Sequence, residues 1–158
     1  MYQKLFTPIK IRNLELKNRI VLPAMGTKFS GKTSFVTDKL IDYHVARVKG
    51  GTGLSIVEVC SVHTPSAPRH FLSLSDDCYI PGMKKLTDAI HEAGGKAGLQ
   101  LWQGSICVGM DRTAQILVAS DMPLGEGRVL PGISKEMIAE VVDAYGKAAA
   151  RAVASGFD

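Results

Sequence analysis

Three stretches of the sequence join an apolar run to side chains that suit a flat ligand. The first runs through the apolar segment 20–22 and then places two small residues on either side of a long one, as Ala24, Met25 and Gly26. Small residues where a strand ends let a planar group lie close to the backbone. Two later strands end in a similar way, at Cys60 and at Gln100. Three such ends indicate a binding face made from strand C-termini.

Gln100 carries the clearest chemical signal of the three. It is a long polar amide inside an apolar strand, so the amide needs a partner. Because an amide both donates and accepts, it suits a ligand edge that shows a carbonyl beside an N–H. Cys60, considered alone, is typical of a small core residue.

No established catalytic motif accompanies these residues, since the sequence holds no GxSxG, HExxH or P-loop. The adjacent pair Asp76-Asp77 precedes an expected helix, which favours a cap or a solvated turn over acid–base chemistry. His44 and His91 fall within expected helices, so we expect them at the surface or partly packed. His63 and His70 lie in a long loop near the expected face, where a substrate role is the minority interpretation.

The composition is that of an ordinary globular protein, with 46% hydrophobic and 22% charged residues in 158. The net charge of +4 is spread along the chain without a basic, aromatic-rich stripe, so we expect no nucleic-acid partner. No apolar run approaches the roughly 20 residues of a membrane span. The cysteines Cys60, Cys78 and Cys107 form no CxxC pair, which indicates free thiols, no metal site and a cytoplasmic location.

Patterning predicts the elements that must position these residues. Residues 8–17 alternate apolar and polar around a turn, which predicts a hairpin. Strand–helix units are then expected at about 19–49, 53–94 and 96–155, joined by long loops at 61–77 and 103–133.

Two further details of the helices follow from the sequence. Thr37 and Ser134 are expected to cap the first and last helices. The inner face of the last helix is expected to comprise Ile138, Val141, Val142, Tyr145, Ala149 and Ala152.

The alternation of strands and helices predicts an α/β fold with parallel strands and right-handed crossovers. An open doubly wound sheet and part of a (β/α)₈ TIM barrel both fit this order. The first strand–helix turn, 23–31, has no G-x-G-x-x-G, which weakens the dinucleotide-fold alternative. A whole barrel takes about 250 residues. We therefore expect residues 1–158 to be a partial TIM barrel of about three βα units, with the second half absent.

The sequence resembles the old yellow enzyme family, FMN-dependent ene-reductases built on a (β/α)₈ barrel. The resemblance covers almost the whole chain and rests on motifs that occur in the family's order. These motifs are KLFTPIKI at 4–11, LKNRIVLPAM at 16–25, GGTGL at 50–54, the stretch 58–62, Gln100-Leu101 and AAARAVASGFD at 148–158. Among the branches, the chain is most similar to the enoate and 2,4-dienoyl-CoA reductases.

The resemblance implies FMN as cofactor and NAD(P)H as reductant. Ala24, Met25 and Gly26, with the neighbouring Thr27, would line the flavin, and Cys60 would pack against it. Gln100 would bond the pyrimidine edge of the ring. The implied reaction passes a hydride from NAD(P)H through the flavin to the activated C=C bond of an enone, enoate or enoyl thioester.

The sequence departs from the family in two positions and stops before others. Many members carry a hydroxyl or thiol where Gly26 stands, and a His where Gln103 stands. The resemblance places the substrate-holding residues, the proton donor and the phosphate-binding segment beyond Asp158. The iron–sulfur cluster of some longer relatives would also be held by later cysteines.

Two alternatives to this enzyme remain open from the sequence. One is an inactive half-barrel that acts through self-association or by pairing with its missing half, since bare sheet edges and apolar faces favour association. We accordingly expect a homo-oligomer or the remainder of the same barrel as partner. The other is a different barrel enzyme such as an aldolase, but the nearest lysine, Lys28, lies in a loop rather than at a strand end.

Overall fold

The structure, a computed structural model, describes residues 2–104 and 114–158. Cys107 and part of the expected loop 103–133 lie outside the described residues. In chain order the strands and α-helices are β1 (Ile9–Ile11), β2 (Leu14–Leu16), β3 (Val21–Leu22), α1 (Asp38–Lys49), β4 (Leu54–Ser61), β5 (Leu72–Ser73), α2 (Ile80–Glu92), β6 (Lys96–Trp102), β7 (Met122–Gly125), β8 (Arg128–Leu130) and α3 (Lys135–Ala154).

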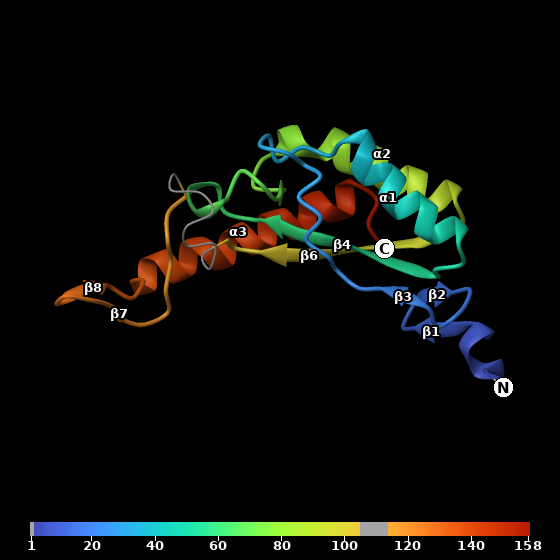
Figure 1. Cartoon of the computed structure of the whole chain (residues 1–158), viewed down its shortest axis with the longest axis horizontal. Coiled ribbons are helices and arrows are strands. Elements are labelled where there is room, and N and C mark those ends of the chain that lie inside the picture. Colours follow the sequence, from blue (N-terminus) through green and yellow to red (C-terminus); the bar gives the residue numbers. More distant parts are fainter. Residues whose placement is uncertain (1, 105–113) are drawn as a thin grey trace.

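The first element is the expected hairpin. β1 and β2 pair antiparallel, with Ile9 opposite Leu16. Arg12 takes a left-handed backbone conformation at the turn, with φ of 52°. The hairpin lies at the N-terminal end of the parallel strands, and β7 and β8 lie at the opposite end (Figure 1). The prediction of a hairpin at 8–17 is confirmed.

The parallel sheet places β4 at its centre. β3 pairs with the start of β4, and β6 pairs with β4 along its length, both in parallel. The crossovers run through α1 and α2, as the strand–helix alternation predicts. β3 is shorter than the expected strand, because Pro23 cannot donate to a ladder.

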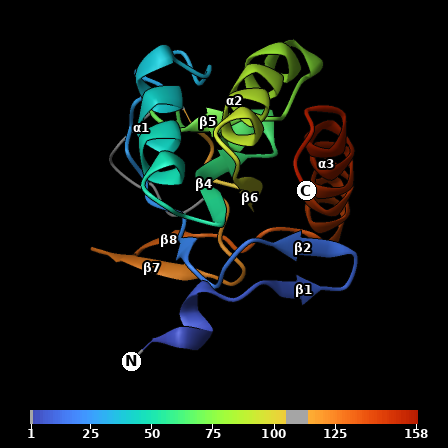
Figure 2. The same ribbon diagram turned by 90° about the vertical axis from the view of Figure 1, so that its right-hand side faces the viewer.

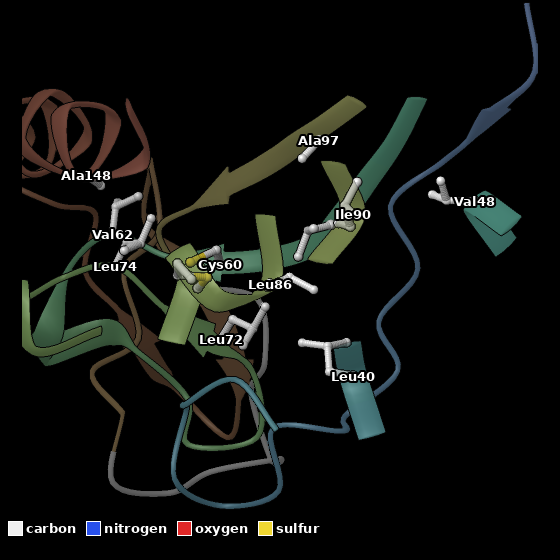
Figure 3. Packing of buried hydrophobic residues seen from close by; sticks show 12 residues of the cluster. Leu40, Val48, Cys60, Val62, Leu72, Leu74, Leu86, Ile90, Ala97 and Ala148 are labelled. Carbon is white, nitrogen blue, oxygen red and sulfur yellow. The ribbon is translucent and has the colours of Figure 1, made fainter. Parts of the chain in front are cut away.

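The three helices gather around one side of the sheet (Figure 2). Thr37 Oγ1 accepts from the backbone N–H of Leu40 at 3.3 Å, and Ser134 Oγ accepts from that of Met137 at 3.2 Å. Both predicted N-caps are therefore confirmed. Between helices and sheet lies a closely packed core that includes Val57, Leu72, Leu86, Ile90 and Ala97 (Figure 3).

The expected inner face of α3 is partly wrong. Ala148 is its buried contact, with Ala144, Tyr145 and Ala152 packed against the core. Ile138 is 47% exposed and Val142 64% exposed, and Ala149 is also exposed. The helix carries apolar residues over more than one face, and periodicity alone does not say which face meets the sheet.

Both long loops contain short strands that the sequence analysis missed. β5 lies within 61–77 and pairs in parallel with the end of β4, with Leu72 beside Cys60. β7 and β8 form an antiparallel hairpin within 103–133, with left-handed residues at its turn. Asp76 caps the short 3₁₀ turn Asp77–Tyr79 by accepting from the backbone N–H of Cys78 at 2.9 Å, so its expected role as a cap is confirmed.

The expectation for His44 is also wrong, because His44 is 2% exposed. Its Nδ1 lies 2.7 Å from Ser55 Oγ on β4, and its Nε2 has no partner among the described residues. Burial, and to a smaller extent the charge of Arg47, lowers the pKa of His44 to about 4. Within the described ranges, no helix is long and apolar enough to cross a membrane.

Candidate functional site

The carboxyl ends of β3, β4 and β6 meet at one edge of the sheet. Residues 24–27 follow β3 there, and Met25 is 56% exposed. Gln100 lies near the end of β6 and is exposed. Its amide makes no side-chain hydrogen bond to the part of the chain that the structure describes. At this one edge, residues 24–27 therefore offer open surface and Gln100 offers an unused amide, which is the arrangement expected from the sequence.

A buried carboxylate holds the segment after β3 in place. Glu58 is completely buried, and its Oε2 accepts a short hydrogen bond from the backbone N–H of Thr27. Thr27 Oγ1 accepts in turn from the backbone N–H of Phe29 at 3.1 Å. Glu58 Oε1 has no partner among the described residues. The sequence analysis did not single out Glu58, although an acidic residue inside an apolar strand is itself a signal.

A β-bulge at Glu58 decides which residue of β4 lies beside Gln100. Val57 is paired with Leu99, but Val59 rather than residue 58 is paired with Gln100. The extra residue reverses the alternation of side chains along the rest of the strand. Val59, which is half-buried, consequently becomes the neighbour of Gln100 in the register.

The same bulge turns Cys60 into the core. Its side chain is 0% exposed and packs among Leu72, Leu74 and Leu86 (Figure 3). Burial, together with the charge of Glu58, raises the pKa of the thiol. The structure thus brings Ala24, Met25, Gly26, Thr27 and Gln100 to one edge, and it places Cys60 behind that edge.

Two aromatic rings border the site. Phe71 and Trp102 make an edge-to-face contact with centroids 5.4 Å apart and an interplanar angle of 79°. A Cβ added to Gly26 would lie 3.6 Å from Phe71, so this ring lies directly against the segment after β3. Trp102 follows Gln100 by two residues in the same strand and therefore points to the same face of the sheet. Phe71 gave no signal in the sequence, because its loop contains no periodic pattern.

The two histidines considered for a substrate role are placed differently. His63 is 4% exposed and bonded through both ring nitrogens, to Ser66 and to Glu140. His70 is half-buried, and its carbonyl oxygen accepts from Ser30 Oγ at 3.2 Å. In the described ranges, no group of three or more His, Cys, Asp or Glu side chains could hold a metal ion. The edge therefore offers an amide, small residues and aromatic rings, which suit a planar organic group.

Comparison with known proteins agrees with this geometry. Residues 4–158 match the profile of the NADH:flavin oxidoreductase / NADH oxidase family. An NADPH dehydrogenase of Listeria monocytogenes is 36% identical over 158 residues, covering 98% of this chain and 46% of that protein. A metal reductase of Desulforamulus reducens is 36% identical over 156 residues, covering 98% of this chain and 23% of that protein.

Solved structures show the same fold. An old yellow enzyme from Pichia sp. AKU4542 superposes with a TM-score of 0.82 at 26% identity, over 98% of this chain and 44% of that one. Morphinone reductase superposes with a TM-score of 0.77 at 24% identity, over 98% and 46%. The chain thus spans between about a quarter and about half of these proteins, and the partial TIM-barrel fold is confirmed.

Proposed function

The chain belongs to the NADH:flavin oxidoreductase / NADH oxidase family, and from this premise we propose that it carries the flavin-contacting part of an FMN-dependent oxidoreductase. The reductant is NAD(P)H, and the acceptor is the activated C=C bond of an enone, enoate or enoyl thioester. The free amide of Gln100 at the open edge is the observation that carries this proposal. A solvent-facing amide with no partner among the described residues is suited to the alternating donors and acceptors of a flavin pyrimidine ring.

The segment after β3 supplies the remaining contacts. Ala24, Met25, Gly26 and Thr27 line the bound ring, because small side chains leave room for a planar group beside the backbone. On β4, Val59 takes the contact that the sequence assigned to Cys60, because Val59 is the residue in register with Gln100. When FMN is bound it supplies the hydride chemistry, and the protein orients it.

Further residues of this chain hold and border the surface that would contact the flavin. Glu58 fixes the backbone of Thr27 and thereby the path of the lining segment. Phe71 and Trp102 cover the border of the site with apolar surface, which keeps water from the ring. Free Cys60 and Cys78 agree with a reducing, cytoplasmic setting.

The partner of this face is the remainder of the same barrel. The backbone N–H of Asp158 donates to the carbonyl of Ala97 at 3.0 Å, so the segment after α3 lies beside β6. Apolar side chains on α3, including Val142 and Val153, are exposed at 64% and 74%. Further strands and helices would cover this surface and add the substrate-holding groups. Self-association over the same surface is the second candidate, and it would leave the chain inactive.

Titration of the purified 158-residue chain with FMN tests the proposal. We expect flavin fluorescence to be quenched at about one FMN per chain. Substitution Gln100→Leu should raise the dissociation constant about tenfold, since lost hydrogen bonds to a bound ligand cost about 1 kcal/mol each. Gln3→Leu, in the exposed N-terminal 3₁₀ turn Gln3–Phe6, is the matched control. Equal binding by Q100L and the parent chain, or no binding by the parent, would refute the assignment.

A further inference from the structure

His63 lies directly after β4 and connects three segments. Its Nδ1 is 2.9 Å from Ser66 Oγ, and its Nε2 is 3.0 Å from Glu140 Oε1 on α3. The ring is 4% exposed, whereas Glu140 is 56% exposed. Ser66 Oγ also donates a short hydrogen bond to the carbonyl of Gln103, just beyond β6. A continuous chain of hydrogen bonds therefore runs from α3 to the end of β6.

The partners of His63 fix the orientation of its ring. Ser66 has one hydroxyl proton, which it donates to the carbonyl of Gln103. His63 Nδ1 lies 2.9 Å from the same hydroxyl oxygen, and a carboxylate oxygen of Glu140 lies 3.0 Å from Nε2. Both ring nitrogens therefore have a partner, which holds the ring in one orientation.

The chain of bonds ends at the aromatic border of the site. The backbone N–H of Val62, next to His63, donates to the carbonyl of Trp102 at 2.9 Å. A side chain at Gly104 would collide with the carbonyl of Ser66, so the two segments are in close contact. The backbone on both sides of Gln103 is thus attached to residues 62–66, and His63 attaches those residues to α3.

We infer that the His63–Glu140 pair is a positioning device that holds Trp102 and the end of β6 against the flavin face. The inference rests on the proposed function for its effect on FMN, but its effect on Trp102 is independent of FMN. Neither residue touches the cofactor, so both act through the backbone of β6. Without Glu140, the ring of His63 loses its outer partner and the 62–66 segment loses this hydrogen bond to α3.

Replacement of Glu140 tests this inference without disturbing the core, because its side chain is exposed. Glu140→Leu removes the hydrogen bond, and Glu140→Gln keeps an amide within reach of Nε2. Asp143→Asn, which alters an exposed carboxylate on the same helix that pairs with Lys147, is the matched control. Trp102 is the single tryptophan of the sequence, so its emission spectrum reports its surroundings directly.

We expect E140L to shift the Trp102 emission to longer wavelength and to increase its quenching by acrylamide, with far-UV circular dichroism unchanged. The FMN dissociation constant should rise about threefold to tenfold, as expected for one net hydrogen bond. E140Q and D143N should remain near the parent values. An unaltered Trp102 emission in E140L, or an equal change in D143N, would overturn the inference. If the parent chain binds no FMN, the proposed function fails. The comparison of Trp102 emission still decides whether the His63–Glu140 pair positions Trp102.

Discussion

Lowering the pH from 7 to 5 should destabilise this fold through His44. His44 is buried between α1 and β4 with one ring nitrogen unpartnered, and its pKa is lowered from 6.5 to about 4. A lowered pKa means that the folded protein favours the neutral form of the His44 ring. The unfolded chain therefore binds more protons below pH 6.5, and the contribution of His44 to stability is complete above that pH and lost as the pH falls toward 4.

The size of this effect follows from the two pKa values. The gap between 6.5 and about 4 corresponds to about 3 kcal/mol once both states are protonated. Between pH 7 and pH 5 the expected loss is about 2 kcal/mol. The perturbed carboxyl groups titrate below this window, because the pKa values of Asp38, Asp76, Glu136 and Asp158 are lowered further from ordinary values near 4.

Urea unfolding followed by circular dichroism at pH 7 and pH 5 measures the loss. The variant His44→Asn removes the titrating ring and keeps a polar atom near Ser55 Oγ, which lies 2.7 Å from Nδ1. We expect H44N to be less stable than the parent at pH 7, because it leaves a cavity. Its stability should change by about 2 kcal/mol less than that of the parent between the two pH values. Equal losses in both proteins would show that His44 is not the group responsible.

Substitutions at three further positions test the site and the packing. Glu58→Ala removes the acceptor of the Thr27 N–H, so we expect the binding free energy of FMN to weaken by about 1.5–3 kcal/mol in a fluorescence titration. Glu58→Gln retains an oxygen acceptor and should keep most of the affinity. A normal FMN affinity in E58A would contradict this role of Glu58. Gly95→Ala places a Cβ 2.6 Å from Cγ1 of the buried, β-branched Val48, and should destabilise the fold by about 1–3 kcal/mol. In Gly146→Ala on α3, the added Cβ meets nothing within 4 Å, so this variant should stabilise the fold by up to about 1 kcal/mol. Thermal melts measure both glycine variants. Similar melting temperatures for these two glycine variants would disprove the steric argument.

Local chemistry allowed much of this fold to be predicted from the sequence. The hairpin, the two N-caps at Thr37 and Ser134, and the strand that opens the unit at 96–155 each depend on neighbouring residues and formed where expected. The open strand-end edge with Gln100 was also predicted, because an amide in an apolar strand is unusual whatever the rest of the chain does. The family assignment rested on motifs that occur in the family's order, and both the motifs and their order are read directly from the sequence.

The features that sequence reasoning missed depend on contacts between distant residues. At the bulge, β4 shifts its register against β6 and the Glu58 carboxylate reaches Thr27, and Cys60 moves from the expected face into the core. No local pattern records such a shift in register. His44 became buried because α1 packs against β4, where its ring meets Ser55.

The sequence by itself determined the order of the hairpin and the three strand–helix units, and the caps that begin the first and last helices. Tertiary structure alone decided which face of α3 is buried, which residue of β4 stands beside Gln100, and that His63 joins Glu140 to the end of β6. The reason is physical: propensities and caps act over a few residues, whereas burial and register depend on surfaces that meet only when the whole chain has folded.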